Sequence, residues 1–179
     1  MLTNRRLKFR GALMNCLNPT RPAKWVVGDL KQGLAWDFYY ILTCEKYWNE
    51  NEHDYYPKWT EHRVIPESIG LFTGKKDKNG RDIYEGDLLY YDGDVCKHCN
   101  KVIYESSRGY YLVEWDSNCS LGFEANQMRG DNFLSPDVWK DLEVKGTWFD
   151  DHHMFDDDIW EQYNPILNNK TEKMLKDCF

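Results

Sequence analysis

Short apolar and aromatic runs, separated by Gly, Pro, Asn and Asp, dominate the pattern of this 179-residue chain. Residues 6–10 alternate apolar and basic side chains at the two-residue period of a β-strand. Two more strands are predicted at residues 24–30 and 37–43, and the second is apolar on both faces, as in a buried strand. Gly28 interrupts the first of these two strands and indicates a bulge or a close approach of another backbone.

Residues 45–63 depart from this regularity, because they mix charged and aromatic side chains with no clean period. We expect them to leave the sheet as an aromatic excursion, in which His53 and His62 flank a cluster of Tyr and Trp. Such rings could stack on nucleic-acid bases. A packed segment or a subunit interface is favoured, since Tyr and Trp are enriched at interfaces. The chain then returns to a strand over residues 63–74, where Pro66 must lie at an edge or a bend because it has no N–H to donate.

A dense polar turn lies between two apolar stretches in "IGLFTGKKDKNGRDIYEGDLLYY", residues 69–91. The residues expected to build this structural motif are Gly74, Asp77, Asn79, Gly80, Glu85, Gly86 and Asp87. Residues 77–80 suit a tight turn, because Asp and Asn bond their own backbone and Gly accepts a positive φ. Gly86 lets the chain bend again, and Asp87 can hold that bend through nearby backbone N–H groups. A turn, a kink and a strand are what a small, strongly curved β-barrel needs at a corner.

The rest of the chain continues the β pattern. Residues 101–106 and 109–116 read as a hairpin, and residues 143–149 as a closing strand. Between them, residues 135–142 predict a short helix or merely a turn, because Ser and Pro begin the segment in the order that suits an N-cap and a first helical position. A short amphipathic helix is expected near the C-terminus.

We therefore predict a mainly β fold, with a small SH3-like barrel centred on residues 64–149. An N-terminal β segment packs on this barrel, and one or two minor helices accompany it. The predicted organisation is an N-terminal β segment with the aromatic excursion over residues 1–63, a barrel core over 64–150, and an acidic connector with a C-terminal helix over 151–179. The 16% aromatic content agrees with a core built from rings on pleated sheets.

Charge and cysteine content bear on compartment and partners. No apolar run is long enough to cross a bilayer, and the start lacks an apolar segment of signal-peptide length, so a cytoplasmic protein with six Cys as thiols is expected. The net charge is -7, yet residues 1–31 hold seven Lys and Arg against one Asp, whereas residues 131–179 hold five against twelve Asp and Glu. The basic arm could contact a phosphate backbone. Pairing with acidic parts of the same or a neighbouring molecule is favoured, because the acidic body repels nucleic acid.

Two clusters contain residue types that bind metals. Cys96 and Cys99 have the spacing of a zinc knuckle, but no second Cys-x-x-Cys completes a site, so two loop thiols are favoured. His152 and His153 lie in an acidic run whose imidazoles and carboxylates suit a divalent ion. A solvated acidic connector is favoured there as well, and we expect no cofactor.

Glu85 and Asp87 would share one face of a strand as a carboxylate pair, but Gly86 between them favours a kink, so we expect no catalytic role. The chain has no phosphate-binding Gly-rich loop, nucleophile elbow or dinucleotide fingerprint. The turn lysines are favoured as a solvated hairpin tip. The residues that could instead follow a nucleic-acid backbone are Arg5, Arg6, Lys8, Arg10, Lys75, Lys76, Lys78 and Arg81.

Four segments occur in a fixed order, "LKFRG", "KWVVGDL", "VIPESIGLFTGKKDKNGRDIYEGDLL" and "EVKGTWFDD". In this order they resemble the YopX-like family of phage and prophage proteins, over roughly residues 7–150. The resemblance implies a mainly β, phage- or prophage-encoded protein that forms a homo-oligomer, and it implies no reaction. The chain departs from the family pattern at residues 44–63, at the insert 94–101 and after residue 151.

Together these features favour a non-enzymatic phage or prophage accessory protein of the host-cell cytoplasm. It would assemble with itself or bind a host or phage protein, and it would not contact a membrane. A nucleic-acid-binding small β-barrel is the alternative. A metal-dependent enzyme is a remote alternative, which rests only on the Cys pair and the His run.

Overall fold

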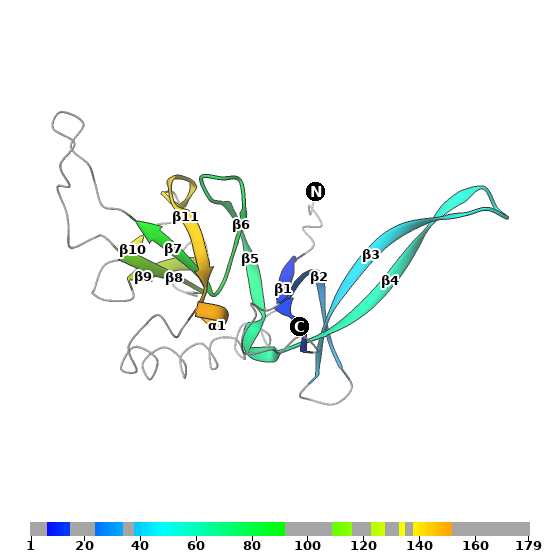
Figure 1. The fold of residues 1–179 in the computed structure, drawn as a ribbon, viewed down its shortest axis with the longest axis horizontal. Helices are drawn as coiled ribbons and strands as arrows, with labels where there is room; N and C mark the ends of the chain where they lie inside the picture. Colours follow the sequence, from blue (N-terminus) through cyan, green and yellow to red (C-terminus); the bar gives the residue numbers. More distant parts are fainter. Residues whose placement is uncertain are drawn as a thin grey trace, which may run out of the picture. The chain divides into compact units, whose positions relative to one another are not determined.

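The computed structural model describes residues 7–14, 24–33, 38–91, 109–115, 123–127, 133–134 and 138–151. The chain divides into two compact units, residues 1–71 (unit 1) and residues 72–179 (unit 2). The described parts of both units consist mainly of antiparallel β-strands, which confirms the predicted fold class (Figure 1).

Unit 1 is built on one antiparallel sheet. Its elements are β1 (Phe9–Ala12), β2 (Trp25–Gln32), β3 (Tyr39–Asn49), β4 (Asp54–Val64), the 3₁₀ turn η2 (Pro66–Ser68) and the first residues of β5 (Gly70–Lys76). The strands lie in the order β4-β3-β2-β1-β5. Strands β1 and β2 lie within three residues of the predicted strands, whereas β3 continues six residues beyond the predicted end at residue 43. The buried apolar side chains of this unit are Phe9, Ala12, Leu30, Ile41, Val64, Ile69 and Leu71.

Gly28 allows β2 and β3 to approach closely. Gly28 pairs with Phe9 of β1, while the next residue, Asp29, begins the pairing with β3. A Cβ added at Gly28 would lie 2.0 Å from the carbonyl oxygen of Leu42, so no side chain fits there. The predicted close approach of another backbone is therefore confirmed.

The bend predicted at Pro66 is also present, because Pro66 begins η2. Hydrogen bonds fasten this bend to the end of β1. The backbone N–H of Ile65 donates to the carbonyl of Ala12 at 3.0 Å, and the backbone N–H of Ala12 donates to Ser68 Oγ at 2.8 Å. Ser68 Oγ in turn donates to the carbonyl of Ile65 at 2.6 Å.

The prediction that residues 45–63 leave the sheet is wrong. Strands β3 and β4 pair without interruption from Tyr39 opposite Val64 to Asn49 opposite Asp54. Strand β2 pairs only with residues 39–42 of β3. From Thr43 onward the two strands have no other strand neighbour among the described residues, and they extend as a two-stranded ribbon (Figure 1). Side chains on both faces of this ribbon meet solvent, so the usual apolar–polar alternation of a strand is lost there.

Unit 2 contains a second antiparallel sheet. Strand β6 (Asp82–Tyr84) pairs with the end of β5. The remaining strands are β7 (Asp87–Tyr91), β8 (Gly109–Trp115), β9 (Phe123–Gln127), β10 (Phe133–Leu134) and β11 (Glu143–Thr147), in the order β10-β9-β8-β7-β11. Both faces of β7 and β8 are buried, since Leu88, Leu89, Tyr111, Leu112 and Val113 are all fully covered. The pairing of the described strands is open at both ends, and the SH3-like barrel stays a prediction.

The elements predicted after residue 100 are described only in part. Strand β8 is present at the second half of the expected hairpin, whereas residues 101–106 lie outside the described residues. The helix or turn predicted over 135–142 is described only from residue 138, where a 3₁₀ turn, η4 (Trp139–Asp141), is found. The closing strand is β11, which pairs with β7 and leads into the short helix α1 (Trp148–Asp151). The expected C-terminal helix lies outside the described residues, and no helix within the described ranges is long and apolar enough to span a membrane.

Candidate functional site

Asp77 lies at the centre of the turn between β5 and β6, and its side chain is buried. Its Oδ1 accepts hydrogen bonds from the backbone N–H groups of Asn79 at 2.8 Å and Arg81 at 2.9 Å. Its Oδ2 accepts a third from the backbone N–H of Val144 in β11, at 3.2 Å. Gly80, with φ +79°, takes the left-handed conformation that closes the turn. The carboxylate therefore holds three main-chain N–H groups in place.

The Glu85-Gly86-Asp87 segment forms the second corner. Asp87 is fully buried, and its Oδ2 accepts a hydrogen bond from the backbone N–H of Tyr84 at 2.7 Å. Gly86 has φ +78°, donates to the carbonyl of Val113 at 2.9 Å and accepts from the backbone N–H of Trp148 at 2.8 Å. Glu85 is also buried, at 4% exposure. Both carboxylates are therefore buried at a corner that main-chain hydrogen bonds brace.

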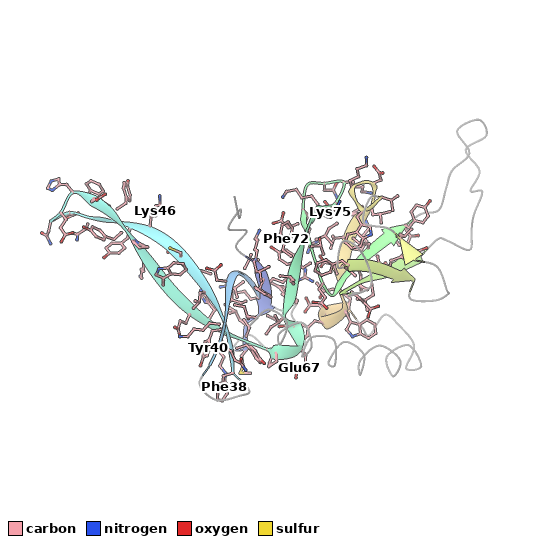
Figure 2. All side chains as sticks on the ribbon, turned by 180° about the vertical axis from the view of Figure 1, so that it is seen from behind. Phe38, Tyr40, Lys46, Glu67, Phe72 and Lys75 are labelled. Carbon is pink, nitrogen blue, oxygen red and sulfur yellow. The ribbon has the colours of Figure 1, made fainter. Side chains whose placement is uncertain are left out.

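The basic residues proposed for nucleic-acid binding separate into three groups. Arg5 and Arg6 lie outside the described residues. Lys8 is half-buried, and Arg10 is buried with its guanidinium 4.8 Å from the centre of the Trp25 ring. The other four, Lys75, Lys76, Lys78 and Arg81, surround the Asp77 turn (Figure 2, which labels Lys75).

Carboxylates offset much of the charge at this turn. Lys76 forms an ion pair with Asp82, and Lys78 forms one with Glu143 at 2.8 Å. Glu143 also pairs with Lys145 at 2.8 Å. Hydrogen bonds from Lys145 and Lys78 lower the pKa of Glu143 to about 2. The turn therefore presents alternating charges, which is a weaker attraction for a phosphate backbone than the lysines alone suggest.

The residues proposed as metal ligands, Cys96, Cys99, His152 and His153, lie outside the described residues. Within the part of the chain that the structure describes, no group of three or more His, Cys, Asp or Glu side chains could hold a metal ion. The zinc and divalent-ion hypotheses therefore stay untested predictions.

The ribbon formed by residues 43–60 carries four of the seven exposed large hydrophobic side chains among the described residues. Tyr47 is 48% exposed, Trp48 and Trp59 are 47% exposed, and Tyr55 is 62% exposed. Figure 2 shows side chains standing out on both sides of the ribbon, with Lys46 along its length and Tyr40 near its base. Exposed aromatic surface of this kind marks interaction sites in soluble proteins.

The strand register assigns these side chains to two faces. Residues opposite one another share a face, and successive residues alternate. One side, named here the aromatic face, carries Cys44, Lys46, Trp48, Tyr55, Pro57 and Trp59, in the cross-strand pairs Cys44–Trp59, Lys46–Pro57 and Trp48–Tyr55. The opposite face carries Thr43, Glu45, Tyr47, Tyr56, Lys58 and Thr60. The two faces therefore differ, and apolar groups dominate only the first.

Contacts between neighbouring rings keep the ribbon ordered near its tip. The rings of Trp48 and Tyr55 meet edge to face with their centres 5.0 Å apart, and the imidazole of His53 lies 6.2 Å from Trp48. On the other face, Tyr47 and Tyr56 are 6.2 Å apart, and the Tyr56 hydroxyl donates to Glu52, which raises the pKa of Tyr56. A two-stranded hairpin is marginally stable alone in water, so these pairs are needed to hold the arm in one conformation.

The sequence pattern predicted a packed segment or an interface for these aromatic residues, but it did not predict the strands that position them. One signal could have revealed the strands. The pairs Tyr47-Trp48 and Tyr55-Tyr56 stand symmetrically about the polar segment 49–54, as expected for a hairpin with its tip there.

One comparison with known proteins identifies the family. The family described as YopX protein matches residues 31–154. The crystal structure of protein EF1440 from Enterococcus faecalis is similar with a TM-score of 0.48 and 15% sequence identity, over 84% of this chain and 98% of that chain. No curated protein matches.

Proposed function

The chain belongs to the YopX family, and on that premise we propose that it is a non-enzymatic accessory protein, encoded by a phage or prophage, that acts in the host cytoplasm by binding protein. The partner is a further copy of itself or a host or phage protein. The ribbon of residues 43–60 is the surface that makes the contact.

The observation that carries this proposal is the exposure of four large aromatic side chains on an arm with no other strand beside it among the described residues. Tyr and Trp are enriched at protein interfaces because they bury a large area at a small cost in conformational entropy. Exposing the rings of such an arm to water is unfavourable, and a bound protein would cover them.

We propose that the protein has no enzymatic activity because of where the carboxylates of its structural motif lie. Asp77 and Asp87 accept hydrogen bonds from main-chain N–H groups, and both are buried. The most specific segment of the family resemblance therefore supports the fold, which leaves the ribbon, where the chain departs from the family pattern, as the place that we propose for function.

The test is size-exclusion chromatography with light scattering on the full chain at high concentration, for the wild type and for a variant with Tyr47, Trp48, Tyr55 and Trp59 replaced by Ser. We expect an assembled wild type and a monomeric variant that retains its β-sheet circular dichroism. A wild type that stays strictly monomeric counts heavily against self-assembly, and an assembled variant would show that the ribbon is not the contact.

Nucleic-acid binding is the less supported alternative. Lys76 and Lys78 of the turn are paired with carboxylates, and Arg10 packs on Trp25. The ribbon tip carries the acidic residues Glu50, Glu52 and Asp54. Binding to a single-stranded oligonucleotide that weakens steeply with salt would favour this alternative, and no binding at low salt would remove it.

A further inference from the structure

We propose that the ribbon binds a different protein by strand addition, in which an extended segment of that protein lies along β3 over residues 43–49 and places an acidic side chain opposite Lys46. This inference rests on the proposed function, because it takes the ribbon as a protein-binding surface. It adds which part of the ribbon makes the contact and which class of segment is bound there.

The edge of β3 is open because of the path of β2. Residues 29–32 of β2 pair with residues 39–42 of β3, whereas residues 25–28 pair with β1 instead. Among the described residues, no strand takes the place of β2 along residues 43–49, and the ribbon continues alone (Figure 1). This stretch is named here the open edge. Its length suits an added strand of ordinary size.

Every second residue of the open edge points its backbone N–H and C=O away from β4. The ladder between β3 and β4 continues past Pro57, which has no N–H, so Pro57 belongs to a pair that exchanges no hydrogen bonds. Lys46 lies opposite Pro57 and therefore also turns its backbone groups outward. Tyr55 agrees with this alternation, because its backbone N–H donates to the Asp54 side chain at 2.7 Å. The outward-facing residues of the open edge are therefore Cys44, Lys46 and Trp48.

The outer edge of β4 is a poorer place for a partner strand. Strand β4 is the last strand of its sheet, and Pro57 lies opposite Lys46 halfway along the ribbon. Proline removes a hydrogen-bond donor from any ladder built on this edge, and natural sheets use it there to prevent strands from adding. The open edge contains no proline. A third strand can therefore form a complete ladder on the β3 side.

A third strand would also stabilise the ribbon. A two-stranded hairpin is marginally stable in water, whereas three strands with an apolar face can be stable on their own. Paired residues of neighbouring strands share a face, so side chains opposite Cys44 and Trp48 would extend the aromatic face. Main-chain hydrogen bonds give the affinity in this binding mode, and the contacts of alternate side chains give the specificity.

Lys46 determines the chemistry of the bound segment. It lies at the centre of the open edge, and its side chain is exposed and stands out from the ribbon (Figure 2). No carboxylate in the described part of the chain forms an ion pair with it. Opposite charges on neighbouring strands stabilise a sheet, so the segment carries Asp or Glu at this position. Apolar residues two positions before and after the acid then lie opposite Cys44 and Trp48.

The same lysine disfavours a second copy of this chain at the open edge. If β3 strands of two copies paired about a two-fold axis over the whole edge, Lys46 would lie directly opposite the same lysine of the other copy. Like charges in that position destabilise a sheet, and natural edge strands carry lysine to prevent such pairing. Shifting the register shortens the ladder. The occupant is therefore a segment of a different protein.

Two fluorescein-labelled heptapeptides, TVTETVT and TVTKTVT, test this assignment by fluorescence anisotropy with the full chain. Both have high β propensity, differ only at the centre, and read the same in both directions, so neither presupposes parallel or antiparallel addition. At low salt, the wild type should bind the glutamate peptide at least about fivefold more tightly than the lysine peptide. Lys46→Glu should reverse this preference, which a variant that fails to fold could not do. The matched control is Lys58→Glu, on β4 and the opposite face, which should keep the wild-type preference.

Amide hydrogen exchange followed by NMR locates the bound peptide. The glutamate peptide should slow exchange at the outward-facing amides of Cys44, Lys46 and Trp48. The amides of Glu45 and Tyr47 already face β4 and should change little. Protection at the outer edge of β4 in place of β3 would overturn the assignment of the open edge.

The outcomes separate this inference from the proposed function. A preference that Lys46→Glu reverses, with protection at alternate amides of β3, supports both. Equal binding of the two peptides, or binding of neither, overturns strand addition directed by Lys46. The proposed function is judged independently by the light-scattering comparison of the wild type with the four-residue Ser variant. If neither peptide binds but the wild type assembles through its aromatic residues, this inference is wrong while the protein-binding role stands.

Discussion

Asp77 and Val144 are 67 residues apart in the chain, yet the carboxylate of the first accepts a hydrogen bond from the backbone N–H of the second at 3.2 Å. The neighbouring backbone N–H of Lys78 donates to the carbonyl of Leu142 at 2.8 Å. Together these bonds join the turn after β5 to the start of β11. The turn is therefore a fixed point of unit 2, although its sequence has the polar composition of an ordinary surface loop.

We expect Asp77→Ala to lower the free energy of unfolding by about 3 kcal/mol, because it leaves one buried and two half-buried backbone N–H groups without their acceptor. Urea denaturation followed by circular dichroism measures this change. The matched control is Asp141→Ala, since Asp141 is exposed and should change the free energy by less than about 0.5 kcal/mol. Equal effects of the two substitutions would contradict the bracing role of Asp77.

Gly28→Ala should be among the most destabilising glycine substitutions in unit 1. The added methyl would lie 2.0 Å from the carbonyl oxygen of Leu42, which belongs to a paired backbone and cannot move aside. We expect a loss of about 3 kcal/mol or more. Gly11→Ala is the comparison, because its methyl would meet Cβ of Val64 at 2.9 Å, a less severe overlap than the 2.0 Å at Gly28. A smaller loss for Gly28→Ala than for Gly11→Ala would show that β2 and β3 can separate at this point.

The sequence predicted the tight turns of this fold more fully than the contacts between residues far apart in the chain. Asp77 and Gly80 have the residue types of a tight turn, and the turn is there. Nothing in the local pattern pointed from Asp77 to Val144, because a hydrogen bond to a distant backbone N–H leaves no residue preference at its far end. The barrel expected from these corners depends on pairings that local pattern does not contain.

The hydrophobic pattern of the sequence did not predict the strands of the ribbon, for a different physical reason. Strand prediction relies on one face being buried, and on this arm both faces meet solvent. Tyr47 and Trp48 are adjacent and equally exposed, so they cancel the two-residue period that would have revealed a strand. The register with β4 assigns them to opposite faces only after the fold is known.

Trp48 and Tyr55 should stabilise the ribbon by the contact between their rings, in addition to the apolar surface that each ring buries. Their rings meet edge to face at 5.0 Å, and such pairs contribute about 1 kcal/mol beyond burial. A double-mutant cycle with Trp48→Ala and Tyr55→Ala, performed on dilute protein, should give a coupling free energy of that size. The readout is hydrogen exchange of the ribbon amides, which should speed up while exchange in β8 stays unchanged. Additive effects of the two substitutions would mean that the contact does not hold the arm.

Glu143 should make the stability of unit 2 depend on pH in the acidic range. Its pKa falls from 4.5 to about 2 in the folded protein, because Lys145 and Lys78 donate hydrogen bonds to its carboxylate. A lowered folded pKa means that the group stabilises the fold above the unfolded pKa and that this contribution is lost as the pH falls toward the folded pKa. Stability measured between pH 4.5 and pH 2 should therefore decrease less steeply in Glu143→Gln than in the wild type. The carboxylate is partly exposed to solvent, so the difference should shrink at high salt. Its persistence in 1 M salt would contradict an origin in these two ion pairs.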